Sequence, residues 1–387
     1  MPIKNRFSEL LPEISAWRRD FHRHPELQYD LPRTSGKVAE LLRSFGVDEV
    51  TEGVGRSGVV GVIKGRSDSK GRVIGLRADM DALPIHEVTG LEHASTTDGK
   101  MHACGHDGHT SMLLGAAKYL AETRNFDGTA IVIFQPAEEG GAGGKAMVDD
   151  GLVSRWSIDE FYGLHNMPGI PVGEFALRPG PIMAAADEFE ITLIGKGGHA
   201  AAPHTTIDTA LIAAQVIVAL QSIVSRNIDP LKNAVVSICV IETDSRTYNV
   251  LPGQVRLQGT ARSLDADVRN QLQERITAIC EGIASALGAE AKVDYRRGYP
   301  ITVNHDEQAA HAAAVAEAVA GKVNAECSPI MAGEDFSYML NERPGAYIFL
   351  GNGDSAALHH PAYDFNDEAI PAGASWLAGM VEARLPA

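Results

Sequence analysis

The stretch Met101–His109, which reads MHACGHDGH, concentrates side chains that bind metal ions. It holds three histidines, one cysteine and one aspartate, and its two glycines let the backbone turn sharply enough to present several side chains to one point. A thiolate beside an imidazole suits zinc-like, manganese-like or cobalt-like divalent ions better than calcium or magnesium. The alternative is a polar loop with a buried cysteine and solvated histidines, since short motifs give false matches.

A pair of adjacent carboxylates gives the second signal. The apolar run at 129–135 predicts a strand that is buried on both faces, and it leads directly into Glu138 and Glu139. Two neighbouring carboxylates at a metal site can divide the work, so that one binds the ion and the other acts as general base. The alternative, a solvated acidic turn, is weakened by the buried strand that precedes it.

Further ligand-type residues also follow predicted strands. Asp79 and Asp81 come just after the strand 73–77, where open α/β sheets place their chemistry, although both can also be turn formers. Five residues together form a candidate ligand set: Cys104, His106, Glu139, His165 and His359. One catalytic zinc needs three protein ligands and a water, so five ligands suit two ions that share a bridging group.

Composition restricts the class of protein. The 387 residues predict two domains, and a net charge of −16 without a basic run argues against a nucleic-acid or anionic-membrane partner. Four scattered cysteines form no disulfide framework, which favours a reduced cytoplasm. The N-terminus has no apolar segment of the signal-peptide kind, and we expect no later stretch to be long and apolar enough to cross a bilayer.

The order of predicted elements gives the architecture. We expect an α/β domain, with a mixed sheet and helices on both faces, formed by residues 1–183 and 298–387. Between them, 184–297 has the order β-α-β-β-α-β of a ferredoxin-like domain. Within the first part, a helix capped by Thr110 or Ser111 should follow the metal-binding stretch, so that its ligands lie on a loop at a helix N-terminus. His22 and His24 lie at the end of the first helix, 6–23, and we interpret them as structural.

The motifs, taken in order, resemble a known family. They are LRADMDALP at 76–84, ACGHDGH at 103–109, QPAEEG at 135–140, GLHN at 163–166, GGHAAAPH at 197–204, NVLPG at 249–253, GEDF at 333–336 and HHPAYDF at 359–365. This series resembles the metal-dependent amidohydrolases of the hippurate hydrolase, indoleacetyl-amino-acid hydrolase and N-acetyldiaminopimelate deacetylase group, within the wider aminoacylase and carboxypeptidase family. The resemblance covers nearly the whole chain.

The resemblance implies a two-metal site and roles for single residues. It assigns the ligand role to the five residues named above, the general-base role to Glu138, and an orienting role to the Asp81 carboxylate. In the wider family the aspartate motif begins with a ligand histidine. Asp79 stands at that position here, so the ligand is expected to come from the Cys104/His106 loop. Of the neighbours His359 and His360, we choose His359 as the ligand.

The expected activity is hydrolysis of an N-acyl amino acid by two Mn²⁺, Zn²⁺ or Co²⁺ ions per subunit. His199, on a glycine-rich loop of a lid and dimerisation domain, would stabilise the oxyanion, and Asn249 would contact the substrate. The resemblance also implies a homodimer or a dimer of dimers. One alternative is an exopeptidase that cleaves dipeptides. Another, a metal-binding module without catalysis, is disfavoured because it would not need Glu138.

Overall fold

The computed structural model describes residues 3–387, and the chain forms two compact units. The first unit comprises the described chain up to Ile182 together with Val303–Ser328 and Asp335–Ala387. The second comprises Met183–Thr302 and Pro329–Glu334. The chain passes between the units near two short paired strands, β7 (Gly180–Met183) and β14 (Thr302–Asn304). The second unit thus resembles the expected insert 184–297, with the short segment 329–334 in addition.

An eight-stranded mixed sheet forms the centre of the first unit. Its order is β1 (Glu49–Val54), β2 (Gly58–Lys64), β4 (Thr129–Gln135), β3 (Val73–Asp79), β5 (Glu160–Pro168), β16 (Gly345–Gly353), β6 (Phe175–Ala176) and β15 (Val323–Asn324). The neighbours β4, β3, β5 and β16 run parallel, whereas β2 is antiparallel to both of its neighbours, β1 and β4. The expected mixed α/β sheet is confirmed. The apolar run of β4 is buried from its second residue to its last, as a central strand covered on both faces must be.

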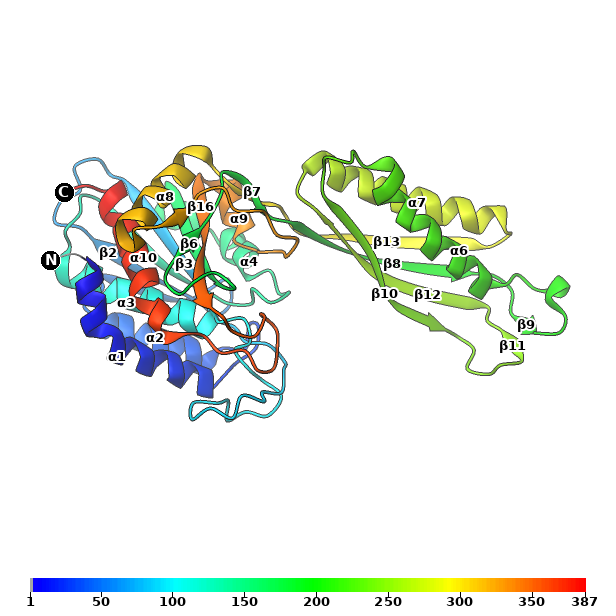
Figure 1. The fold of residues 1–387 in the computed structure, drawn as a ribbon, viewed down its shortest axis with the longest axis horizontal. Helices are drawn as coiled ribbons and strands as arrows, with labels where there is room; N and C mark the ends of the chain where they lie inside the picture. The colour runs from blue at the N-terminus through cyan, green and yellow to red at the C-terminus, as the bar shows by residue number, and fades with distance from the viewer. Residues whose placement is uncertain (1–2) are drawn as a thin grey trace. The chain divides into compact units, whose positions relative to one another are not determined.

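Helices cover this sheet (Figure 1). The larger group contains α1 (Ile3–Arg23), α2 (Pro32–Ser44), α3 (His106–Thr123), α8 (Asp306–Ala320) and α10 (Ile370–Arg384), in which α1, α3 and α10 pack against one another. A smaller group contains α4 (Gly143–Asp149), α5 (Leu152–Trp156) and α9 (Ser337–Glu342), with α4 packed on both α5 and α9. Because β3, β4, β5 and β16 lie inside these layers, the loops that follow them are held at fixed positions.

The start of α3 differs from the expectation. The helix begins at His106, and its N-cap is Gly105 in the left-handed conformation with φ 85°. A Cβ atom at this position would lie 2.3 Å from Nδ2 of Asn166, so only glycine fits. Thr110 does not cap the helix; its hydroxyl donates to the carbonyl oxygen of Asp79. The expected ligand His106 therefore lies in the first helical turn and not on the preceding loop.

The second unit has a four-stranded antiparallel sheet with the order β10 (Ala234–Thr243), β12 (Gln254–Ser263), β8 (Ala185–Ile194) and β13 (Glu290–Tyr299). Helices α6 (Thr209–Ser222) and α7 (Ala266–Ala286) complete the chain order β8-α6-β10-β12-α7-β13, which is the ferredoxin-like order. A separate small sheet pairs β9 (Gly198–His199) with β11 (Val250–Leu251).

One helix corrects the expectation about membrane-spanning segments. Thr209–Asn227, which is α6 and the π-helical turn after it, has 19 residues and a mean hydropathy of 1.5, enough by length and composition to cross a membrane. Packing within the second unit also explains why this helix is apolar. One face of the helix packs into the core of the second unit, where Ile212, Val216 and Leu220 are buried against the sheet and α7.

Candidate metal centre

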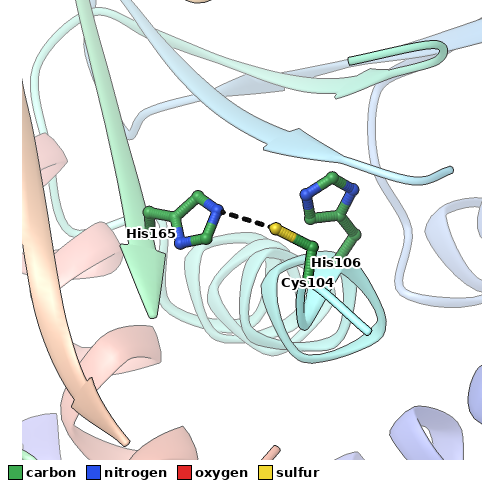
Figure 2. A group of neighbouring side chains, drawn as sticks. All are labelled: Cys104, His106 and His165. Carbon is green, nitrogen blue, oxygen red and sulfur yellow. Dashed lines mark hydrogen bonds between the residues drawn. The ribbon is translucent and has the colours of Figure 1, made fainter. Parts of the chain in front are cut away.

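The five expected ligands lie together in the first unit. Cys104 belongs to two groups of three side chains whose ligand atoms lie within 4.8 Å of one another: one with His106 and His165, the other with Glu139 and His359. The residues come from four places in the fold, namely the entrance to α3, the loop after β4, the strand β5 and the loop after β16. Figure 2 shows Cys104 between the imidazole rings of His106 and His165.

Both buried histidines of this cluster are oriented by backbone carbonyls. His106 Nδ1 lies 2.8 Å from the carbonyl oxygen of Asp81, and His165 Nδ1 lies 2.6 Å from that of Asn166. A carbonyl only accepts, so in each neutral ring the proton resides on Nδ1 and the lone pair on Nε2. Among the described residues, Nε2 of His106 is buried without a hydrogen-bond partner. Such a fixed imidazole with an unused Nε2 is the usual arrangement of a metal ligand.

The thiol of Cys104 is buried and surrounded by acceptors. Its Sγ lies 3.4 Å from Nε2 of His165. Burial, and next the carboxylates of Glu139 and Glu138, raise the pKa of this thiol well above its usual range. A bound cation would offset both effects and favour the thiolate, which is the form that binds metals.

Asp81 orders the turn that carries the two glutamates. Its carboxylate accepts the backbone N–H groups of Glu138 and Glu139 at 2.9 and 3.1 Å. The turn is tight, because Ala137 before it adopts a left-handed φ of 53°. Glu139 Oε1 then lies 3.3 Å from Nε2 of His359, and among the described residues this buried oxygen has no hydrogen-bond partner. The Glu138 carboxylate joins the same cluster through Glu139 and His106.

The cluster carries excess negative charge in a buried place. Although burial opposes it, the carboxylates of Asp79, Asp81 and Glu139 raise the pKa of His106 to about 10. The pKa of Asp81 is also raised, because burial, and then repulsion from Glu139, outweigh the hydrogen bonds that its carboxylate accepts. Buried like charges are costly unless a cation balances them. The donor set of thiol, imidazole and carboxylate, with its unused Nε2 and Oε1 atoms, therefore fits divalent metal ions.

Asp79 and His109 form a supporting hydrogen-bond chain behind the cluster. Asp79 accepts from Nδ1 of His109 at 2.6 Å and from Arg77 at 2.7 Å. Nε2 of His109 accepts the backbone N–H of Asn166 at 2.9 Å, and the carbonyl of this same Asn166 orients His165. Both nitrogens of His109 are thus engaged. This role of His109 was not predicted from the sequence, although His109 follows His106 by three residues, a spacing that places both on one helix face.

The loop after β16 separates the two neighbouring histidines. His359 has a left-handed φ of 64° and approaches Glu139. Nδ1 of His360 instead accepts the backbone N–H of Ala362 at 3.1 Å. The structure therefore groups His359, the residue chosen from the sequence, with the other four candidate ligands.

The two histidines at the end of α1, His22 in its last turn and His24 just after it, have structural partners. Nδ1 of the fully buried His22 lies 2.8 Å from Oδ2 of Asp107, which follows His106 in α3. Nδ1 of His24 lies 2.8 Å from the carbonyl of Asp20. The contact between His22 and Asp107 therefore connects α1 to the first turn of α3, which agrees with the interpretation of His22 as a structural residue.

His199 and Asn249 lie together in the second unit. His199 of β9 is paired with Val250 of β11, and the carbonyl of Asn249 accepts the N–H of Ala200 at 3.0 Å. Both side chains are exposed. Nδ1 of His199 accepts the N–H of Ala201 at 3.0 Å, so in the neutral ring Nε2 carries the proton and can donate.

Comparison with known proteins agrees with this geometry. Residues 75–383 match the model of peptidase family M20/M25/M40. The chain is 44% identical to hippurate hydrolase of Campylobacter jejuni subsp. jejuni, over 96% of both chains, and 40% identical to N-acetylcysteine deacetylase of Bacillus subtilis, over 94% of both. Among solved structures, a protein of Bacillus subtilis described as a dinuclear metal binding peptidase from the M20 family superposes with a TM-score of 0.85 at 34% identity, over 98% of this chain and 99% of that one.

Proposed function

Since this chain belongs to peptidase family M20/M25/M40, we propose that it hydrolyses the amide bond of N-acyl amino acids, releasing a carboxylate and a free amino acid. One observation carries the proposal: a cluster of thiol, imidazole and carboxylate donors, most of them buried, that includes an adjacent second glutamate. The similarity to a hippurate hydrolase and an N-acetylcysteine deacetylase supports this substrate class, since both names refer to N-acyl amino acids.

The five clustered donors would hold two divalent ions, which we propose to be Mn²⁺, Zn²⁺ or Co²⁺. Five protein ligands exceed the three that a single catalytic zinc uses. The relative described as dinuclear supports the same number. When bound, such ions lower the pKa of a water toward neutrality and polarise the amide carbonyl.

The remaining steps belong to protein side chains. Glu138 would take a proton from the attacking water and return it to the leaving nitrogen. The two hydrogen bonds that Asp81 accepts fix the backbone on which Glu138 stands, so its carboxylate has a defined direction. His199 would donate from Nε2 to the developing oxyanion, and Asn249, which directly precedes the paired strand β11, would contact the substrate.

We propose further that the second unit acts as a lid and as the dimerisation domain, in a homodimer or a dimer of dimers in the cytoplasm. A lid that closes over substrate excludes water and completes the catalytic groups. The exposed position of His199 and Asn249 at one small sheet is consistent with such a movable contribution.

The second candidate is a metallo-exopeptidase that cleaves dipeptides with the same residues. It is favoured by the description of one structural relative as a peptidase. The two functions differ in one requirement, because a dipeptidase must accept a charged α-ammonium group where an N-acyl amino acid has a neutral group.

The test is direct. Protein reconstituted separately with Mn²⁺, Zn²⁺ and Co²⁺ is incubated with N-benzoyl, N-acetyl and N-arylacetyl amino acids and with dipeptides, and the free amine is measured. Glu138→Gln serves as the control for contaminating hydrolases. Turnover of N-acyl amino acids well above that of dipeptides supports the proposal, and a preference for dipeptides would replace it with the exopeptidase.

A further inference from the structure

Asp335 is a buried aspartate of the first unit that is not among the five candidate ligands. It belongs to the motif GEDF at 333–336 and lies just before α9. Its Oδ1 accepts from Nη2 of Arg77 at 2.9 Å and from Nε2 of Gln135 at 2.7 Å. Nε of Arg77 donates to Oε1 of Gln135 at 2.9 Å. The three side chains therefore close a ring of hydrogen bonds, and all three are buried.

The carboxylate of Asp335 holds both ends of the turn that carries the two glutamates. Gln135, the last residue of β4, precedes this turn, and Gly144, in the first turn of α4, follows it. Oδ1 of Asp335 accepts from the side chain of Gln135, and its Oδ2 accepts the backbone N–H of Gly144 at 2.7 Å. A carboxylate oxygen of Asp335 also lies within 4.8 Å of one of Glu138. Asp335 thus fixes the two ends of the turn, while Asp81 fixes its middle.

The close approach of Asp335 requires glycine at the start of α4. A Cβ atom on Gly144 would lie 2.7 Å from the backbone carbonyl oxygen of Asp335 and 3.1 Å from Oε1 of Gln135. On the preceding Gly143, a Cβ atom would lie closer still to the carbonyl oxygen of Pro136. Only a residue without a side chain fits at either position unless the backbone moves. The two glycines therefore give Asp335 the space to reach the glutamate turn.

Arg77 joins this turn to the histidine side of the candidate metal centre. Its Nη1 donates to Oδ2 of Asp79 at 2.7 Å, and Oδ1 of Asp79 accepts from His109. The guanidinium also lies over the ring of Phe336, with 5.8 Å between Cζ and the ring centroid, a cation–π contact. A buried guanidinium that donates to a carboxylate on each side has a defined position. Asp335 and Arg77 therefore set the glutamate turn against the Asp79–His109 chain.

We propose that Asp335 is a positioning residue, which fixes the direction of Glu138 and Glu139 relative to the histidine side of the centre. The inference rests on the proposed function, in which Glu138 is the general base and Glu139 a ligand. Asp335 would touch neither the ions nor the substrate, because it acts through the side chain of Gln135 and the backbone of Gly144. Both glutamates lie in the turn between these two residues, so the loss of Asp335 should displace them together.

Two variants weaken the ring in different ways. Asp335→Asn keeps the shape of the side chain but replaces one acceptor by an amide NH₂ group. In either orientation that group faces donors, from Gly144 on one side or from Arg77 and Gln135 on the other. Gln135→Met removes two hydrogen bonds of the ring and changes no charge, so it provides the test if Asp335→Asn does not fold.

Asp187→Asn is the matched control. Asp187 is a buried aspartate of the second unit that also pairs with an arginine, Arg269, and accepts a backbone N–H, that of Gly298 at 3.1 Å. Its replacement by asparagine removes a buried carboxylate of the same kind outside the metal centre. The control therefore separates a general loss of stability from a displaced glutamate turn.

The measurements are the affinity for Co²⁺ and Mn²⁺ by calorimetry, the absorption spectrum of the Co²⁺ form, and kcat and KM at saturating metal. We expect both ring variants to lower the metal affinity about 10- to 100-fold and to change the Co²⁺ spectrum, because the ligand Glu139 is displaced. At saturating metal, kcat should fall by up to about 100-fold while KM changes little, because a misplaced general base slows the chemical step. The control should unfold at lower urea concentration but keep the metal affinity and the spectrum.

The double variant Gln135→Met/Asp335→Asn should lose less metal-binding free energy than the sum of the two single losses, because both changes act through one ring. Three results would overturn the inference: unchanged affinity and spectrum in ring variants that fold, additive losses in the double variant, or the same losses in Asp187→Asn. Circular dichroism verifies the fold of each variant. Failure of the proposed function looks different, since the unaltered protein would then bind Co²⁺ but hydrolyse neither N-acyl amino acids nor dipeptides. The affinity and the spectrum need no substrate, so they decide the inference in that case as well.

Discussion

His109 and Asp79 are joined by a buried hydrogen bond of 2.6 Å between Nδ1 and Oδ1. The bond leaves Nε2 of His109 as an acceptor, and this atom holds the backbone N–H of Asn166. Asn166 in turn orients His165 through its carbonyl and donates from its side chain to the carbonyl of Cys104. Asp79 thus serves two proposed ligands, His165 and Cys104, indirectly.

The first prediction follows from this chain. His109→Phe removes the acceptor for Asn166, so the affinity for divalent ions should fall about 10- to 100-fold, as it does when partners of metal-binding side chains are lost. Calorimetric titration with Mn²⁺ and the absorption spectrum of the Co²⁺ form measure this without reference to activity. His311→Phe, an exposed histidine of α8, is the control. Unchanged affinity in His109→Phe would show that the chain does not position the ligands.

Several elements could be predicted from the sequence because their signals are local. β4 covers 129–135 as expected, since a short apolar run rich in β-branched residues favours a buried strand. α8 covers Asp306–Ala320, with acidic residues in its first turn and a left-handed Gly321 as C-cap. The five clustered side chains were also predicted from their types and their places on loops beside strands or helices.

Other features depend on contacts between distant residues, which a local pattern does not contain. The start of α3 is fixed at Gly105 by the close approach of Asn166 and Tyr363. The segment Pro329–Glu334 belongs to the second unit because Ala332 pairs with Ala184. The carbonyls that orient His106 and His165 are backbone atoms, so residue types at their positions carry no signal.

The second prediction concerns the number of ions. Five donors in one cluster imply two ions per chain, so chelation should abolish hydrolysis, and Mn²⁺, Zn²⁺ or Co²⁺ should restore it. Elemental analysis of the reconstituted protein gives the stoichiometry. Full activity with no more than one divalent ion per chain would exclude a binuclear centre.

The third prediction separates the two glutamates. Glu138→Gln should keep its metal and lose about 10²- to 10⁴-fold in kcat, because proton transfer is lost while the ligands remain. Glu139→Gln should lose metal affinity as well, since Oε1 of Glu139 lies among the candidate ligand atoms. Metal content and kcat are measured on the same samples. If both variants lost metal equally, the two glutamates would not have separate roles.

The fourth prediction concerns stability and pH, away from the metal centre. Although burial opposes it, hydrogen bonds from Arg384 and Tyr162 lower the pKa of Glu160 to about 2. A lowered folded-state pKa stabilises the protein above the unfolded value, about 4.5, and this stabilisation disappears as the pH falls toward 2. Arg384→Met should therefore cost on the order of 2 kcal/mol in the free energy of unfolding at pH 7 and clearly less at pH 3.

Urea denaturation at the two pH values measures this difference. Arg43→Met is the control, because its ion pair with Glu52 is exposed on both sides and should contribute less than about 1 kcal/mol at either pH. A cost for Arg384→Met that is the same at pH 7 and pH 3 would argue that the side chain acts through packing and not through the charge of Glu160.

The last prediction concerns His199. The hydrogen bond from Ala201 leaves its Nε2 as a donor, and the ring is exposed. We expect it to serve the active site of a partner subunit in a two-fold dimer. His199→Ala should then raise the activation free energy by about 3 kcal/mol, the cost of one oxyanion donor, and so lower kcat. The metal content should stay unchanged.

Mixed dimers decide between action in the partner and action within the same subunit. Inactive His199→Ala subunits are combined with inactive Glu138→Ala subunits, and subunit exchange is verified separately with differently tagged chains. If His199 acts in the partner's site, each mixed dimer has one site that lacks both groups and one intact site. Random exchange makes half of the dimers mixed, so about a quarter of the original activity should return. If His199 acts in its own subunit, every site retains one defect, and activity stays absent despite exchange.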